Sequence, residues 1–233
     1  MKRPIQVCTR EHVEEGLRHL PLYCEPWTAQ EYASALASAP NNPYLLCRAA
    51  QSYYFAGALA KSVEHYERLL RMVPKCTTAR HQLGMAYYRQ GRLRHAQKTF
   101  REVINIDPHF AVAYHWLGQT CYHLGQREEA LQAYRQCVEE SPESLIVLYD
   151  MAIIYAAMGK HEEAAEVLER LTKAFPEDAA AHYHLGMAYS YLDHDQAALA
   201  CFKRALALDP HDRRARHMVK VLSEVTSQKD RLL

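Results

Sequence analysis

The chain has 233 residues with 28 Lys and Arg against 27 Asp and Glu, so its formal net charge is only +1. A balance this even does not favour nucleic acid as a partner. The longest apolar stretch, residues 151–158, is far too short to cross a bilayer, and the first residues contain no apolar segment long enough for a secretory signal. Seven cysteines without a CxxC pair are typical of reduced thiols. We therefore expect a cytoplasmic chain that binds no nucleic acid and does not insert into membranes.

Prolines and glycines mark the chain at a fixed period of 34 residues. The periodic prolines are Pro40, Pro74, Pro108, Pro142, Pro176 and Pro210. Four glycines keep the same spacing, each 17 residues before one of these prolines: Gly57, Gly91, Gly125 and Gly159. Glycine ends a helix by adopting a positive φ, and proline cannot continue one. The predicted unit is helix, glycine turn, helix, proline turn, repeated along one array.

In chain order, residues 1–42 keep the phase weakly and are predicted to be a degenerate N-terminal cap, in which Pro21 cuts the first helix short and a second helix spans about 28–39. Five gapless repeats follow, at 43–76, 77–110, 111–144, 145–178 and 179–212. The fifth has Asp193 at the turn position of glycine, where aspartate can adopt the left-handed region. An amphipathic helix at 213–226, with Met218, Val221, Leu222 and Val225 facing inward, is predicted to cap the array before a frayed tail at 227–233.

The repeat resembles the tetratricopeptide repeat. The second copy carries the pattern most fully, with these residues in order: Leu83-Gly84, Tyr87, Gly91, Ala96, Phe100 and Pro108. The resemblance covers residues 43–212 and implies an all-α fold, a right-handed superhelical α-solenoid of stacked helix-turn-helix units. We call the two helices of each repeat helix A and helix B.

The resemblance also implies that helix A lines a concave groove that binds a partner protein or peptide. Carried over repeat by repeat, the expected groove residues are Tyr44, Gln51, Tyr54, His81, Met85, Tyr88, Arg89, His115, Gln119, Tyr122, His123, Tyr149, Ile153, Tyr183 and Met187. This groove is aromatic and nearly uncharged. Tyrosine offers a large contact area with few torsions to restrict, although some of these tyrosines could instead fill space between adjacent helices.

The family's carboxylate clamp for the acidic C-terminus of chaperones is not expected. The clamp needs lysines and asparagines that no three consecutive repeats supply, and every helix A between 43 and 212 lacks asparagine. The imidazoles of His81, His115 and His123 suggest either a metal site or ordinary hydrogen bonding, and the second is favoured. The sequence at Asp193-His194-Asp195 is favoured as a capped turn over a metal site. No metal and no cofactor are predicted.

Two functions remain open. The first is a non-catalytic interaction module that holds a partner segment for complex assembly, since no catalytic residue or nucleotide-binding motif is recognised. The second is a self-assembling structural protein and hence a homo-oligomer. Residues 43–110 contain eleven Lys and Arg against four Asp and Glu, whereas residues 111–178 contain five against twelve. The basic half of one molecule could then meet the acidic central half of another.

Overall fold

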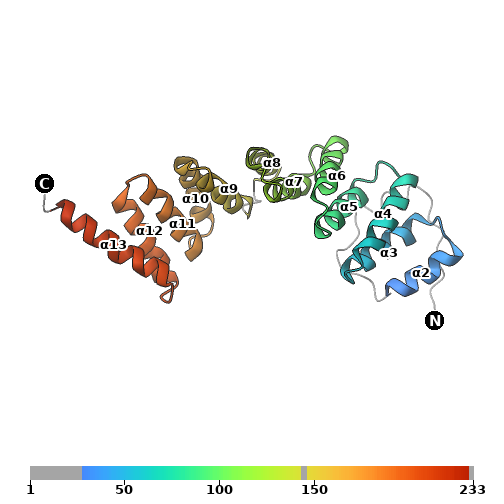
Figure 1. Cartoon of the computed structure of the whole chain (residues 1–233), viewed down its shortest axis with the longest axis horizontal. Helices are drawn as coiled ribbons and strands as arrows, with labels where there is room; N and C mark the ends of the chain where they lie inside the picture. The colour runs from blue at the N-terminus through green and yellow to red at the C-terminus, as the bar shows by residue number, and fades with distance from the viewer. Residues whose placement is uncertain (1–27, 143–145, 231–233) are drawn as a thin grey trace. The chain divides into compact units, whose positions relative to one another are not determined.

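The computed structural model describes residues 28–142 and 146–230, and every regular element in these ranges is a helix. The chain divides into two compact units, Met1–Gln136 (unit 1) and Cys137–Leu233 (unit 2). Unit 1 contains α2 (Ala29–Ser38), α3 (Pro43–Phe55), α4 (Leu59–Met72), α5 (Thr77–Arg89), α6 (Leu93–Ile106), α7 (Ala111–His123) and α8 (Arg127–Glu140) as far as Gln136 (Figure 1). Unit 2 contains α9 (Ile146–Ala157), α10 (His161–Ala174), α11 (Ala179–Tyr191), α12 (Asp195–Leu208) and α13 (Arg213–Asp230). The predicted all-α fold class is confirmed.

The helix boundaries follow from the capping residues in the sequence. The Asn42 side chain accepts a hydrogen bond from the Leu45 amide, and Pro43 takes the first helical position, where its missing N–H costs nothing. Between the two helices of a repeat, the turn glycines have φ between 72° and 77°. Asp193 has φ 59°, as predicted for the residue that replaces glycine in the last turn. The backbone of each repeat therefore reverses at a residue that tolerates the left-handed region.

Helices pack in chain order, each against the next one. In unit 1 this order holds from α2 to α7, and the alternate helices α3, α5 and α7 also touch in sequence. In unit 2 it holds from α9 to α13. Local packing of this kind is the architecture of a helical-repeat protein, in which each repeat packs against its neighbours in the sequence.

The two helices of a repeat approach most closely at a glycine that faces an aromatic ring. A Cβ added at Gly84 on α5 would lie 2.6 Å from the ring of Phe100 on α6, and one at Gly118 would lie 2.5 Å from the ring of Tyr134. Both rings are fully buried. Where the sequence has alanine at this place, the residue sixteen positions later is Leu168 in the fourth repeat (after Ala152) and Tyr66 in the first (after Ala50). Glycine at this place lets a buried aromatic ring of helix B lie directly against the backbone of helix A.

Arginine and histidine side chains hydrogen-bond to the carbonyl groups of four periodic prolines, Pro40, Pro74, Pro176 and Pro210. The carbonyl of Pro40 accepts a hydrogen bond from Arg68 (2.8 Å), and that of Pro74 accepts one from Arg80 (2.6 Å). In unit 2, the carbonyl of Pro176 accepts hydrogen bonds from Arg204 (3.3 Å) and from the His182 ring (3.0 Å), and that of Pro210 accepts one from Arg216 (2.5 Å). These contacts were not predicted from the sequence. Several basic residues therefore stabilise turns.

A tyrosine on helix A is hydrogen-bonded to a glutamate on the preceding helix B in both units. Tyr87 donates to Glu67 at 2.5 Å in unit 1, and Tyr189 donates to Glu169 at 2.7 Å in unit 2. Burial, together with the bond to the carboxylate, raises the pKa of each phenol to about 12. Because the bond joins successive repeats, it fixes one helix pair against the next.

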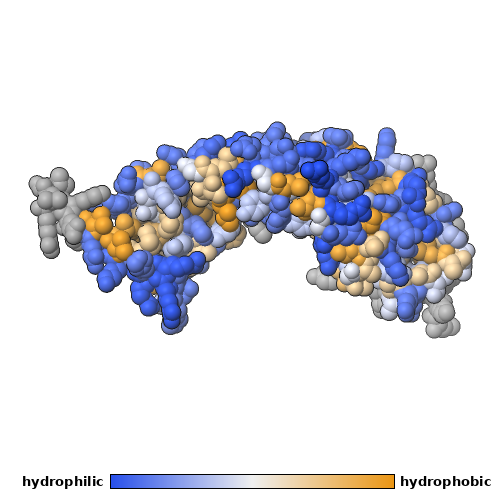
Figure 2. Space-filling view, viewed as in Figure 1, coloured by the Kyte–Doolittle hydropathy of each residue, from blue (hydrophilic) through white to orange (hydrophobic). Residues whose placement is uncertain are grey.

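The ends of the array depart from the sequence prediction in detail. α2 falls within the predicted helix at 28–39, whereas the helix expected before Pro21 lies outside the described residues. α13 continues to Asp230, four residues beyond its expected end at 226. Leu222 is buried and Met218 packs against the core of α12, but Val221 is 38% exposed and Val219 packs there instead. A hydrophobic patch is visible over α12 and α13 (Figure 2). Within the described residues, no helix is both long and apolar enough to span a membrane.

His81 is a buried, neutral member of the core of unit 1. Only 8% of the residue is exposed, and its ring lies 5.4 Å from that of Phe110 and 5.7 Å from that of Phe100. Its Nε2 has no hydrogen-bond partner in the described part of the chain. Burial lowers the pKa of His81 to about 4, because the charged imidazolium would lose its hydration.

The contact between Gly84 and Phe100 predicts a paired mutational effect on stability. Gly84→Ala should lower the free energy of unfolding by about 1–3 kcal/mol, because the added methyl overpacks against a buried ring. Adding Phe100→Leu, which reproduces the alanine and leucine found in the fourth repeat, should cost less than the sum of the two single changes. Urea denaturation of the wild type, both single variants and the double variant measures this coupling. Strictly additive losses would contradict the close-packing account.

The burial of His81 predicts a loss of stability in mild acid. The folded pKa is about 4 and the unfolded pKa about 6.5, so below pH 6.5 the unfolded chain binds a proton that the folded chain excludes. Between pH 7.5 and 5.0 this difference lowers the free energy of unfolding by about 2 kcal/mol. His81→Leu should remove that part of the pH dependence, measured by urea denaturation at both pH values. His115→Leu, at the equivalent place in the next repeat, is the control and should leave it in place.

Candidate functional site

A row of tyrosines runs along the C-terminal ends of α3, α5 and α7 in unit 1. The row consists of Tyr54, Tyr88 and Tyr122, which are 34 residues apart, and we call it the tyrosine row. Each is the penultimate residue of its helix. Tyr122 is 38% exposed, and the other two are half-buried. All three were predicted from the sequence as groove residues, and the stacking of α3, α5 and α7 brings them onto one side of unit 1.

The last residue of each of these helices joins the row: Phe55, Arg89 and His123. The guanidinium carbon of Arg89 lies 4.4 Å from the centre of the Tyr54 ring, and Nη1 donates a 3.0 Å hydrogen bond to the Tyr54 carbonyl. The His123 ring contacts the rings of Tyr88 (5.7 Å) and Tyr122 (5.5 Å). Phe55 is 54% exposed. The result is a partly exposed aromatic surface with one cation in it.

Trp116 packs against the central tyrosine of the row, Tyr88, and was not predicted from the sequence. Its half-buried indole lies 5.3 Å from the Tyr88 ring and 5.4 Å from the His115 ring. The only available signal was that a tryptophan, one of two in the chain, adjoins a predicted groove histidine. His115 in turn contacts the Tyr134 ring at 6.3 Å. These contacts limit the rotamers of the central tyrosine.

The remaining predicted residues of unit 1 differ in exposure. Tyr44 is 37% exposed, Met85 and Gln119 are half-buried, and Gln51 and His81 are buried at 6% and 8% exposure. The Gln51 amide oxygen accepts a hydrogen bond from Arg48 at 3.3 Å. Gln51 and His81 therefore contribute chiefly to the core and present little surface to a partner. Helix position alone could not indicate this, because it does not reveal how deep the neighbouring helix lies.

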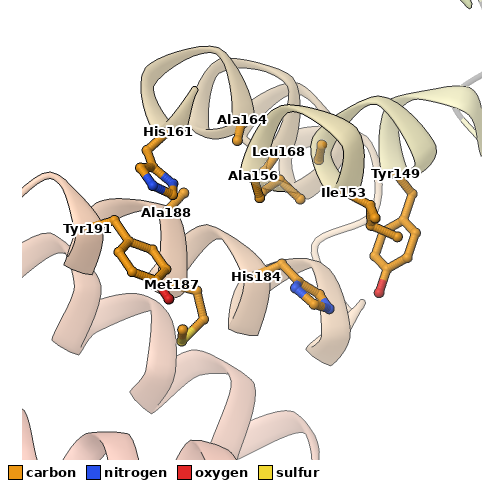
Figure 3. Close-up of a pocket in the computed structure, with 11 residues that line it drawn as sticks. Tyr149, Ile153, Ala156, His161, Ala164, Leu168, His184, Met187, Ala188 and Tyr191 are labelled. Carbon is orange, nitrogen blue, oxygen red and sulfur yellow. The ribbon is translucent and has the colours of Figure 1, made fainter. Parts of the chain in front are cut away.

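In unit 2 the predicted residues lie on α9 and α11 and form a second aromatic surface. Tyr149 and Ile153 come from α9, whereas Tyr183 and Met187 come from α11 (Figure 3 labels all but Tyr183). His184, which was not predicted, contacts the Tyr149 ring edge-on at 5.4 Å and the Tyr183 ring at 5.5 Å. Burial, followed by the charge of Arg214, lowers the pKa of His184.

Tyr183 is enclosed by residues from α12 and α13. Its ring contacts that of Phe202 at 5.5 Å, and the Arg214 guanidinium carbon lies 4.7 Å from its centre. Asp212 accepts hydrogen bonds from the Arg214 side chain at 3.2–3.3 Å, and this bonding lowers the pKa of the Asp212 carboxyl. The helix predicted as a cap thus also supplies a cation to the surface.

A cavity of about 50 Å³ opens between α9, α10 and α11. Its lining is Tyr149, Ala152, Ile153, Ala156, His161, Ala164, Leu168, His184, Met187, Ala188 and Tyr191 (Figure 3). The rings of His161 and Tyr191 stack at 4.3 Å and 13° on one side of it, and Tyr191 is 63% exposed. The buried Nδ1 of His161 has no hydrogen-bond partner among the described residues. The cavity has room for a small aliphatic side chain.

Both surfaces offer aromatic faces, aliphatic side chains, imidazoles and arginines, and the surface of unit 2 also offers the thioether of Met187. Across residues 28–142 and 146–230, no group of three His, Cys, Asp or Glu side chains is arranged to hold a metal ion. The described cysteines Cys47, Cys76, Cys121, Cys137 and Cys201 are free thiols, and burial raises the pKa of Cys47 to about 12, which keeps it protonated.

Known proteins resemble this chain in both sequence family and fold. Two models of the tetratricopeptide repeat match residues 122–188 and 179–212, and a model of subunit 3 of the anaphase-promoting complex, cyclosome, matches residues 56–137. No curated protein matches the sequence of this chain. The matched segments together run without a gap from residue 56 to residue 212.

Among solved structures, YrrB, a TPR protein with an unusual peptide-binding site, is 20% identical, with a TM-score of 0.70 over 83% of this chain and 100% of YrrB. MamA from Desulfovibrio magneticus RS-1 is 19% identical, with a TM-score of 0.66 over 73% of this chain and 97% of MamA. The APC/C hetero-tetramer Cut9–Hcn1 gives 13% identity and a TM-score of 0.56, over 83% of this chain but only 39% of the matched one. At these identities the likeness shows the fold alone. Together with the family models and the in-phase helix pairs, it establishes that this chain belongs to the tetratricopeptide-repeat family.

Proposed function

We propose that the chain is a non-catalytic interaction module that holds a segment of a partner protein against its helix A surfaces and so serves complex assembly. The observation that carries the proposal is the tyrosine row, whose members recur at the repeat period and remain accessible at the ends of helix A in three successive repeats. YrrB, which shares the fold, is described as having a peptide-binding site, and this supports the same role here.

The physical properties of the row suit an interface. Phe55 and Tyr122 expose large apolar surfaces, 54% and 38% of each residue, that a partner segment would remove from water. The Tyr88 ring is already held by Trp116 and His123, so binding would restrict few additional torsions. Aromatic side chains held in place beforehand are the usual source of binding energy in protein interfaces.

The cavity of unit 2 is a second contact in this proposal. It lies beside exposed Ile153 and Tyr191, and its walls are mainly alanine, leucine and methionine side chains. A small aliphatic side chain of the partner would fill it and exclude water from the stacked rings of His161 and Tyr191. The aromatic surface of unit 2 would then have an anchor point.

Self-assembly through opposite charges is less well supported. Arg101, from the basic part of the sequence, pairs with Glu129, from the acidic part, at 2.6 Å within unit 1. Arg80 pairs with Glu102 in the same unit. Some of the charge that would attract a second molecule is therefore already neutralised inside the chain. The free thiols support a reducing, cytoplasmic setting as part of the same proposal.

Removing two members of the row should weaken partner capture. In pull-downs from lysate, Tyr88→Ala with Tyr122→Ala should reduce the captured amount about tenfold or more, because each buried interface tyrosine contributes about 1 kcal/mol or more. The matched control is Met72→Ala with Ile106→Ala, two residues also 34 apart and each 38% exposed, on helix B. Light scattering of the eluted wild type distinguishes a bound partner from a self-assembled oligomer. Equal capture by both double variants would refute the assignment.

Filling the cavity of unit 2 should also weaken capture. Ala156→Leu places a larger side chain at the cavity wall, whereas Ala174→Leu makes the same change at the end of α10, on helix B and outside the lining. Both positions are exposed and helical, so both variants should fold like the wild type. We expect the first to bind the partner several-fold less tightly by interferometry and the second to bind normally. A parallel loss in both would show that the cavity is not the contact.

A further inference from the structure

Carboxylates are absent from the three helices that carry the tyrosine row. α3, α5 and α7 contain no Asp or Glu. The glutamates nearest to them in the sequence lie on α4, α6 and α8, the helices that follow them. Those glutamates include Glu64, Glu67, Glu102, Glu128 and Glu129. This side of the repeats therefore has no acidic side chain of its own to neutralise a cation.

The arginines on these three helices differ in what they bind. Arg80 is paired with Glu102, and Arg48 is buried, with its guanidinium bonded to Gln51. Arg89 is exposed and pairs with no carboxylate in the described part of the chain. Its contacts are the Tyr54 ring, which lies 4.4 Å from the guanidinium carbon, and the Tyr54 carbonyl, which accepts one hydrogen bond from Nη1. The remaining N–H groups of Arg89 are available to a partner.

Arg89 is also held in position before any partner arrives. The stacking on Tyr54 and the hydrogen bond to its carbonyl restrict a side chain that would otherwise sample many rotamers. A guanidinium fixed in this way loses little entropy when it binds a carboxylate through two parallel hydrogen bonds. Figure 2 shows strongly hydrophilic side chains over the region of α5 and α6.

We propose that unit 1 selects a partner segment in which an aspartate or glutamate adjoins an aromatic residue. The carboxylate would pair with Arg89, and the aromatic side chain would lie on Tyr88 and Tyr122. This inference deepens the proposed function and rests on it, because it names the chemistry of the segment that the tyrosine row holds. The carbonyl ends of α3, α5 and α7 carry negative partial charge, so the acidic group belongs at Arg89 and not elsewhere along the row.

The preference belongs to unit 1 alone. The residues of unit 2 at the place of Arg89 are Ala157 and Tyr191, and those at the place of the row are Ala156 and Ser190. None of these side chains carries a positive charge. Unit 2 therefore offers the partner no cation at these places, and Arg214, which α13 supplies to its surface, is already paired with Asp212.

The test uses the full chain and three fluorescein-labelled peptides that repeat Gly-Asp-Phe, Gly-Asn-Phe or Gly-Lys-Phe. Fluorescence anisotropy at physiological salt should show the Asp peptide binding about tenfold tighter than the Asn peptide, as expected for a charge-assisted pair, and the Lys peptide binding weakest. Arg89→Gln should make the Asp and Asn peptides bind equally. Arg94→Gln, an exposed arginine on α6 that removes the same charge, should retain the preference.

Several results would overturn the inference. One is that Arg89→Gln still prefers the Asp peptide over the Asn peptide. Another is that the Arg94→Gln control loses this preference equally, which would indicate long-range charge alone. The third is that none of the three peptides binds. Displacement of the Asp peptide by poly(U) at equal charge concentration would instead indicate a nucleic-acid site and would equally overturn it. The proposed function is tested separately, because Tyr88→Ala with Tyr122→Ala should weaken all three peptides, whereas Arg89→Gln should weaken only the acidic one. Circular dichroism melting curves check that each variant is folded.

Discussion

The structure depends on the close approach of the two helices within each repeat. At Gly84 the backbone of α5 comes so near to α6 that even a methyl group would meet the Phe100 ring at 2.6 Å. This contact fixes the rotation of each helix about its own axis. It therefore decides which residues of helix A turn into the core and which remain accessible. The tyrosine row is accessible because the glycine face of the same helices is occupied by buried rings.

Much of the fold could be predicted from the sequence, because helix ends depend on local residue types. The positive φ of Asp193 and the proline turns follow from the conformations that each residue type permits. How deeply each side chain is buried could not be predicted as well. His81 and His115 occupy equivalent places, yet His81 is enclosed by two phenylalanine rings and His115 is not fully buried. Contacts between separate elements, such as Arg214 against Tyr183, have no signal in the period of the sequence at all.

The two units use the same repeat to present different chemistry. Unit 1 places large rings and an arginine at the ends of its helix A elements, whereas unit 2 places alanine, serine and one tyrosine there and forms a small cavity. These positions contribute little to the contacts between glycine and ring that hold each repeat together. They can therefore differ between repeats without altering the fold. A partner would then be recognised by the order of the repeats along the chain as well as by any one residue.

The arginines at the proline carbonyls have a consequence for dividing or splicing the chain. The carbonyl of Pro40 is bound by Arg68 and that of Pro74 by Arg80, so the acceptor that ends one repeat takes its donor from the repeat after it. In unit 2, the carbonyl of Pro210 likewise accepts a hydrogen bond from Arg216 of α13. A segment cut immediately after such a proline would leave its last turn without the cation that orders it. Modules transplanted from this protein should therefore end within the following helix pair, after the donor arginine, and not at the nominal end of the repeat.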